Sequence, residues 1–381
     1  EARYAEAEKS YKSLGDWLGR DASSLRQYKP VVYVQGSFRL ATVIKPLTDD
    51  EDYDVDSVCE LQLLANNQLS QKQLKEMVGT EVELYRRAQN MAKPLREGRR
   101  CWVLNYADGA QFHMDIVPAL PNAVEHRRLL EAHGYSANYT STAVVITDNE
   151  HEHYHYVSTD WPRSNPKGYA LWFRGQMASI FEERRRTLAE SIRASVEEIP
   201  DYRVRTPLQS AIMILKRHRD IMFAKNMDIR PISIILTTLA AHSYKGEATI
   251  AEALFVILTK MDSFIGQNGQ GHALIQNPTD PLENFADKWA KHPERQQAFY
   301  DWLKQARHDF MQIAALGDRL RIQTLMESRV GTELAKRVGA RATPKSSGLL
   351  RNMTIAPAAA APIAPAFGNQ ARVPTTNRGF A

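Results

Sequence analysis

The chain has 381 residues, of which 43% are hydrophobic and 24% charged, with a mean hydropathy of −0.44 and a net charge of +5. These values indicate a globular protein with one large or two ordinary domains. No apolar run of roughly 18 residues and no cleavable leader is present, so we expect a cytoplasmic protein that does not cross a membrane. The two cysteines, Cys59 and Cys101, are too few for a secreted disulfide framework and too distant in sequence for a local zinc site.

The positive charge suits a protein that handles triphosphates, and it permits binding to nucleic acid without requiring it. Basic residues cluster at 86–87, 96–100, 184–186 and 216–219. Clusters of this kind are more often solvated helix faces than a track for a polynucleotide.

A long helix is predicted at the start of the chain, over residues 2–28. Apolar and aromatic side chains recur there at helical spacing, which indicates that one face packs against the rest of the protein. The residues of this face are Tyr4, Tyr11, Leu14, Trp17 and Leu18.

A turn suited to phosphate follows at Gly36 and Ser37, after the apolar run 31–34. Gly36 has no side chain, so a phosphate can approach the backbone closely. The next N–H groups open a short helical segment whose positive end attracts anions, and Ser37 adds a hydroxyl donor.

Two carboxylates come next, at Asp54 and Asp56. On a strand this spacing places both side chains on one face, about 7 Å apart. Oxygen ligands crowded in this way suit Mg²⁺ or Mn²⁺. The acidic run 49–52 beside them is more typical of a solvated loop, so only the combination with the Gly-Ser turn indicates a nucleotide site.

A third carboxylate, Asp115, is predicted to join them. Residues 69–92 have a helical pattern, and residues 101–105 with 111–117 indicate a hairpin that turns at 107–109 and ends at Pro118. Within the second strand Phe112 faces one way, while His113 and Asp115 face the other. A buried aspartate is costly without a partner, and a metal held by Asp54 and Asp56 would provide one. The alternative is an aspartate at a solvated sheet edge.

These motifs resemble those of the polymerase-β-like nucleotidyltransferases. The longer stretches 36–42 and 52–56 are more specifically similar to the bacterial cGAS/DncV-like nucleotidyltransferases (CD-NTases), the second-messenger synthases of anti-phage CBASS systems, with the CdnD-like clade as the closer suggestion. Residues 165–173 and 215–236 agree with this resemblance. It implies an α+β fold in which a polymerase-β-like core, a mixed β-sheet with helices, packs on a C-terminal helical bundle.

Three domains are expected on this basis: a nucleotidyltransferase core with the N-terminal helix at 1–165, a helical domain at 166–342 and a flexible Ala/Pro-rich tail at 343–381. The alternating histidines His151, His153 and His155 are interpreted as the wet side of a surface strand in preference to a transition-metal site. The pattern beyond residue 165 is helical.

A single buried face is predicted for the helix around residues 208–222, and Lys216, Arg217 and Arg219 are predicted to project away from it. The resemblance implies that Lys216 and Ser233 bind the triphosphate tail; without it, a solvated lysine and a capping serine explain them equally well. Ile234 stands where some relatives have a tyrosine that stacks on the donor base. The buried face consists of Leu208, Ala211, Ile212, Leu215 and Met222. A further amphipathic helix is predicted to close the bundle, with an apolar face of Phe299, Leu303, Ala306, Phe310 and Ile313.

The residues themselves support metal-dependent nucleotidyl transfer. The resemblance implies that the product is a cyclic di- or trinucleotide, adenine-containing, made from ATP and other nucleoside triphosphates. Asp54, Asp56 and Asp115 would hold two Mg²⁺ or Mn²⁺ ions, and Gly36, Ser37, Lys216 and Ser233 would bind the substrate. The alternatives are a linear nucleotidyltransferase acting on RNA or protein, and a non-catalytic regulatory protein. The resemblance also implies as partners a HORMA-type regulator, or a ubiquitin-transfer-like E1/E2 enzyme pair acting on the end of the tail, residues 378–381.

Overall fold

A computed structural model describes residues 2–47, 52–106, 112–193, 195–197 and 199–315. Residues 1–308 form one compact unit, which contains everything discussed below except the end of the last helix. The turn predicted at 107–109, the acidic residues 49–51, the boundary at 342 and the tail 343–381 lie outside the described residues. The other predicted domain boundary, near residue 165, stays a prediction.

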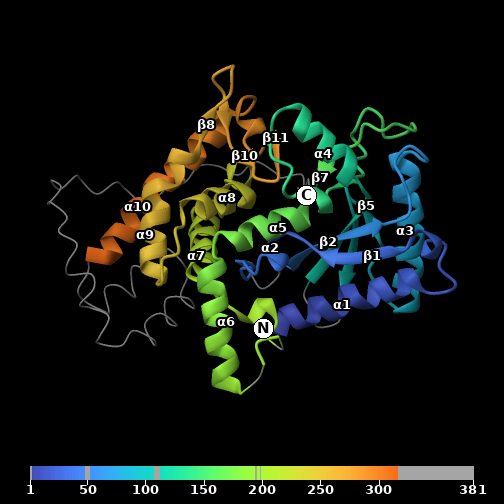
Figure 1. Cartoon of the computed structure of the whole chain (residues 1–381), viewed down its shortest axis with the longest axis horizontal. Coiled ribbons are helices and arrows are strands. Elements are labelled where there is room, and N and C mark those ends of the chain that lie inside the picture. Colours follow the sequence, from blue (N-terminus) through green and yellow to red (C-terminus); the bar gives the residue numbers. More distant parts are fainter. Residues whose placement is uncertain (1, 48–51, 107–111, 194, 198, 316–381) are drawn as a thin grey trace. The chain divides into compact units, whose positions relative to one another are not determined.

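The first half of the chain is built on a mixed seven-stranded sheet (Figure 1). Its order is β1-β2-β5-β4-β3, and β6 pairs with β5 and β7. Only the β2–β5 pair is parallel among these strands, and every other pair is antiparallel. The strands are β1 Pro30–Val34, β2 Tyr53–Leu61, β3 Arg96–Glu97, β4 Trp102–Tyr106, β5 Phe112–Pro121, β6 Val144–Ile146 and β7 Arg163–Ser164.

Two helices cover one face of this sheet, and their local sequences explain where they lie. In α1, Leu14 and Leu18 are fully buried, and the helix runs beside β1 (Figure 1). In α3, the Ser70–Gln73 capping box fixes the start, and Gly79 leaves room for the indole of Trp102 from β4. The helices of this half are α1 Ala2–Gly19, α2 Gly36–Arg39, α3 Gln71–Ala88 and α4 Ala123–Ala132.

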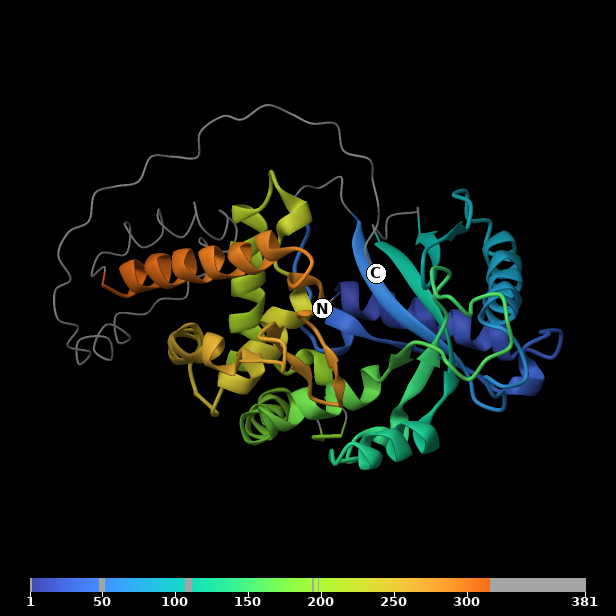
Figure 2. The ribbon, with the colours of Figure 1, turned by 90° about the horizontal axis from the view of Figure 1, so that it is seen from above.

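The second half of the chain is mainly helical. Figure 2 shows the strands of the sheet and helices α5 to α9 in different regions of this unit. Thr206 caps α7 in a box with Gln209, and Thr249 caps α9 with Glu252. The helices are α5 Pro166–Gly175, α6 Ala178–Ile192, α7 Pro207–Met222, α8 Ser233–Ser243, α9 Ile250–Lys260 and α10 Pro293–Ala315, with two small hairpins, β8 Gly266–Gln267 with β9 Ala273–Leu274 and β10 Gln276–Asn277 with β11 Asp280–Asn284.

The α+β class, the helices around residues 71–88 and 293–315, and the hairpin of β4 with β5 are confirmed. The predicted first helix is too long, because α1 ends at Gly19. The carboxylate of Glu81 on α3 accepts hydrogen bonds from the backbone N–H and the hydroxyl of Ser24, at 2.8 Å each, and so holds the chain in a turn.

The pairing of β4 with β5 stops at Ile116, so the hairpin ends before Pro118 as predicted, but β5 itself continues to Pro121. On one side of β5, β4 pairs with residues up to Ile116, and β6 pairs with residues from Ala119 to Pro121. Pro118 lies in the gap between the β4 and β6 pairings, so its missing N–H interrupts neither ladder.

Candidate active site

The parallel pairing of β2 with β5 brings the predicted carboxylates together. Asp54 is the register partner of His113, and Asp56 is the partner of Asp115. Alternate residues of a strand share a face, so these four side chains lie on one face of the sheet. Residues between them, such as Val55, point into the core on the opposite face and are fully buried.

Three of the four polar side chains form a close group. The Nε2 atom of His113 lies 3.4 Å from Asp54 Oδ1 and 4.0 Å from Asp115 Oδ1. One potential ligand atom from each of the three residues lies within 4.8 Å of the others. Asp115 Oδ1 is buried and has no hydrogen-bond partner among the described residues, and Asp115 Oδ2 accepts a weak hydrogen bond from the Cys101 thiol, at 3.4 Å.

Asp56 takes a different direction and lies against the Gly36 turn. A Cβ atom added to Gly36 would be 2.3 Å from Asp56 Oδ2, so no side chain fits at this position. Gly36 also has φ +57°, in the left-handed region that favours glycine. Gly36 and Ser37 open the short helix α2, and the N–H of Gln35, just before it, donates to the carbonyl of Asp56.

Burial and neighbouring negative charges raise the pKa values of Asp56 and Asp115. Burial and the Asp54 and Asp115 carboxylates raise the pKa of Asp56 to about 8. Burial and the Asp54 carboxylate also raise the pKa of Asp115, while a hydrogen bond with Asp54 raises the pKa of His113. Like charges at this separation favour a bound cation or a retained proton.

Lys216 reaches this region from α7 and is buried, so the alternative of a solvated lysine is wrong. Its side chain is 4% exposed, and its Nζ donates to the carbonyl of Thr42 at 3.2 Å. Burial and the nearby Arg219 guanidinium lower the pKa of Lys216 to about 8, and Asp56 acts in the opposite direction. The prediction for Arg219 is also wrong, because Asp220 neutralises it in a buried pair at 2.6 Å.

The segment that follows α2 is held by side chains from the start of the helical region. The carbonyls of Leu40 and Ala41 accept hydrogen bonds from Gln209 and Arg205, at 3.0 and 2.6 Å. With the bond from Lys216 to Thr42, the carbonyls of three successive residues, 40 to 42, accept hydrogen bonds from side chains in or just before α7. The helical region therefore fixes the chain directly after the predicted phosphate turn.

Ser233 is the first residue of α8, as the sequence predicted for a helix start. Its hydroxyl accepts a hydrogen bond from Arg219 Nη1 at 2.9 Å. The same guanidinium binds Asp220, which also pairs with Arg230 at 3.1 Å. Ser233 is thus held by the Arg219–Asp220 pair of α7.

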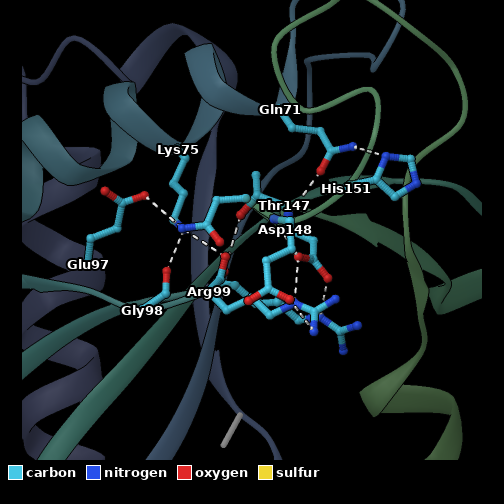
Figure 3. Close-up of polar contacts among 11 residues, drawn as sticks. Gln71, Lys75, Glu97, Gly98, Arg99, Thr147, Asp148 and His151 are labelled. Carbon is cyan, nitrogen blue, oxygen red and sulfur yellow. Dashed lines mark hydrogen bonds and ion pairs between the residues drawn. The ribbon is translucent and has the colours of Figure 1, made fainter. Parts of the chain in front are cut away.

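A polar network around two buried side chains, Lys75 and Asp148, fixes the loop that carries Cys101 (Figure 3). Lys75 of α3 donates to the carbonyls of Gly98 and Arg99, at 2.6 and 2.8 Å, and pairs with Glu97 at 3.1 Å. Asp148, whose side chain is 2% exposed, pairs with the guanidinium groups of Arg99 and Arg100. These bonds hold the loop in the position from which the Cys101 thiol reaches Asp115.

Three residues near the site were not predicted for it: His113, Cys101 and Arg219. His113 could have been found, because it alternates in phase with Asp115. Cys101 depends on the loop conformation, and Arg219 on the packing of α7 with α8, for which the sequence gives no signal.

The histidine-rich stretch is not a strand. Residues 151–156 form turns, and Gln71 Nε2 donates to His151 Nδ1 at 3.1 Å. His153 Nε2 lies 3.6 Å from Glu152 and 3.7 Å from Asp160, so the cluster that forms contains one histidine and two carboxylates.

The family model described as "Cyclic GMP-AMP synthase DncV-like, nucleotidyltransferase domain" matches residues 30–118. A c-di-GMP synthase of Roseivirga ehrenbergii is 30% identical over 315 residues, which cover 82% of this chain and 75% of the relative. The cyclic dinucleotide synthase CdnG of Bradyrhizobium diazoefficiens is 25% identical over 332 residues, which cover 85% of this chain and 74% of the relative.

Solved structures share the fold. The structure of Bradyrhizobium diazoefficiens CdnG in complex with GTP has a TM-score of 0.64 at 20% identity, covering 88% of this chain and 93% of that one. The E. coli MS115-1 CdnC:HORMA-deltaN complex has a TM-score of 0.58 at 12% identity, covering 87% and 92%. Vibrio cholerae DncV in complex with ATP, GTP and 5MTHFGLU2 has a TM-score of 0.55 at 12% identity, covering 88% and 89%.

The fold and the site define a nucleotidyltransferase of the polymerase-β-like class. With a relative 30% identical over most of both chains, this protein belongs to the DncV-like family of nucleotidyltransferases, the CD-NTases. Membership of the CdnD-like clade stays a prediction. Among the described residues, no helix has the length and apolar character needed to cross a membrane.

Proposed function

We propose that this protein is a metal-dependent synthase that joins nucleoside triphosphates into a cyclic dinucleotide second messenger. The observation that carries the proposal is the position of Asp54, Asp56 and Asp115 on one sheet face beside the Gly36 turn. The relatives named c-di-GMP synthase and cyclic dinucleotide synthase support a cyclic product.

The three aspartates would hold two Mg²⁺ or Mn²⁺ ions. The residues fit this role, because Asp115 Oδ1 is buried without a hydrogen-bond partner among the residues that the structure describes and the neighbouring charges disfavour ionised Asp56. When bound, such ions neutralise the triphosphate and the departing pyrophosphate and lower the pKa of the acceptor hydroxyl.

The chain's own groups would bind and orient the triphosphate. Gly36 gives the turn its left-handed conformation, and the backbone N–H groups that open α2 and the Ser37 hydroxyl would be the donors to phosphate oxygens at this turn. Lys216, beside the segment that follows this turn, would supply positive charge, and Ser233 a hydroxyl from α8. A tail held in this way lets the acceptor hydroxyl approach the α-phosphorus in line.

We infer that GTP is a substrate, because one relative is named for c-di-GMP and another was solved with GTP. We also propose that ATP is a second substrate and that the product contains adenine. Ile234 cannot stack on a base as an aromatic ring would, so contacts of another kind must select the donor base.

Incubation with labelled ATP, GTP, CTP and UTP and Mg²⁺ or Mn²⁺, without an added acceptor, tests this function. We expect a small product that resists phosphatase and contains guanine. Asp115→Asn keeps the size of the side chain and removes its charge, and we expect no product from it, whereas the exposed Glu131→Gln serves as the matched control. A product that forms only when RNA or protein is added would identify a linear nucleotidyltransferase and overturn the proposal. No turnover with any metal, nucleotide or candidate activator would point to a non-catalytic protein.

The cellular role is proposed as anti-phage signalling within a CBASS system, by resemblance. Its partner would be a HORMA-type regulator, as in the CdnC complex, or an E1/E2-like enzyme pair that conjugates the tail. Cells carrying this system should resist phage, and Asp115→Asn should remove the resistance. Mass spectrometry of the tail from these cells tests the second partner, since conjugation adds the mass of an attached protein.

A further inference from the structure

His113 is a fourth polar side chain in the group of carboxylates. It stands opposite Asp54 in the strand register and two residues before Asp115, so the geometry of the sheet places its imidazole on their face. Its Nε2 atom points to both of them, at 3.4 Å from Asp54 Oδ1 and 4.0 Å from Asp115 Oδ1.

These separations suit one shared ion. Octahedral coordination at about 2.1 Å places neighbouring ligand atoms about 3 Å apart and opposite ones about 4.2 Å apart. The atoms of Asp54, His113 and Asp115 lie within 4.8 Å of one another, and small side-chain rotations would bring all three to one cation. Asp56, in contrast, is directed toward Gly36.

We propose that His113 Nε2 is a ligand of one of the divalent ions, together with Asp54 and Asp115, and that it makes the site prefer Mn²⁺ to Mg²⁺. The inference rests on the proposed function, which supplies the ions. Mg²⁺ binds oxygen ligands and keeps its waters, whereas transition-metal ions accept an imidazole nitrogen. The nitrogen therefore adds affinity for Mn²⁺ and little for Mg²⁺.

The competing explanation is that His113 only orients Asp54 through a hydrogen bond. Such a positioning role would affect both metals equally and would place no nitrogen on the ion. The experiment therefore has to detect the nitrogen itself.

Pulsed electron paramagnetic resonance of Mn²⁺ bound to the full chain does so, because a directly bonded ¹⁴N nucleus modulates the electron spin echo. We expect this modulation in the wild type and its loss in His113→Asn, with His113→Gln as a second variant should the first not fold. His153→Asn is the matched control, because His153 belongs to the other cluster, with Glu152 and Asp160. It should keep the signal.

Calorimetric titration of the same proteins adds a second readout. His113→Asn should weaken Mn²⁺ binding by about tenfold and leave Mg²⁺ binding within about twofold. Absence of the nitrogen signal in the wild type, its survival in His113→Asn, or an equal loss for both metals would overturn the assignment.

Failure of this inference can be told apart from failure of the proposed function. If Asp115→Asn loses metal binding and turnover while His113→Asn changes neither, the synthase stands and the histidine ligand falls. If the nitrogen signal is present and no nucleotide is turned over, the ligand stands and the function falls.

Discussion

Asp56 and Asp115 are register partners across the parallel pair of β2 and β5. A parallel pair needs a crossover connection, and here that connection contains α3 and the two strands β3 and β4. The hydroxyl of Ser57 donates to the carbonyl of Asp115 at 3.0 Å, which further fixes the two strands. Two acidic residues distant in sequence are thus direct neighbours on one face of the sheet.

Removal of Asp54 or Asp115 should abolish turnover and leave the fold intact. The side chain of Asp54 is 53% exposed, so its loss should change the free energy of unfolding by no more than about 0.5 kcal/mol. Nucleotide turnover and thermal melting of Asp54→Ala and Asp115→Ala check this. Measurable turnover in either variant would contradict the assigned roles.

Substitution of Gly36 should harm activity more than its backbone strain explains. Gly36→Ala places a methyl group 2.3 Å from the present position of Asp56 Oδ2 and must displace that carboxylate. Gly134→Ala is the matched control, because Gly134 also has a positive φ, +75°, but has open space around it. Both should lose about 1 kcal/mol of stability from strain, and only Gly36→Ala should lose turnover. Equal turnover in the two variants would refute the argument.

Lys216→Met should weaken the use of nucleoside triphosphates. Loss of a charged donor to phosphate costs about 1.5–3 kcal/mol, which corresponds to a decrease of about ten- to a hundredfold in kcat/KM. Steady-state kinetics at saturating metal measures the effect. Arg217→Met, one residue along the same helix, removes a side chain that donates to the carbonyl of Lys45 outside the site, and it should retain most of the activity. Similar losses in both variants would indicate a general effect of charge.

Asp148→Asn should destabilise the protein in a pH-dependent way. Burial of the Asp148 carboxylate acts to raise its pKa. Hydrogen bonds from Arg99 and Arg100 have the larger combined effect and lower the pKa below its usual value of 3.8. The folded state thus favours the ionised form, so this stabilisation is present above about pH 4 and is lost as the pH falls through the folded pKa. We expect a loss of about 1–3 kcal/mol at pH 7 that shrinks toward pH 3.

Chemical denaturation of the wild type and Asp148→Asn between pH 3 and 7 measures this difference. Glu150→Gln is the control, since Glu150 pairs with Arg99 but its side chain is 64% exposed. It should change stability by no more than about 0.5 kcal/mol at any of these pH values. A difference between wild type and Asp148→Asn that does not depend on pH would disprove the role of the ionised pair.

Local sequence was sufficient where one short segment decides the outcome. The alternation around Asp115 predicts its strand and face, the Gly36–Ser37 turn begins a helix as expected, and the buried face of α7 contains the predicted leucines. Errors arose where a distant residue decides. Glu81 of α3 holds the turn that follows the first helix, and the exchange of partner strands beside β5 lets that strand continue past Pro118.

The sequence by itself determined the positions of Asp54, Asp56 and Asp115 on their strands and the glycine at position 36, because strand periodicity and backbone sterics act over a few residues. The α+β class followed from the resemblance of these motifs to a known family. Only the tertiary structure decided that His113 joins two of the carboxylates, that Lys216 is buried against Thr42, and that Lys75 and Asp148 hold the loop of Cys101. The alternation of residues 113 and 115 indicates that they share a face, but the contacts themselves depend on strand register and helix packing between segments far apart in the chain.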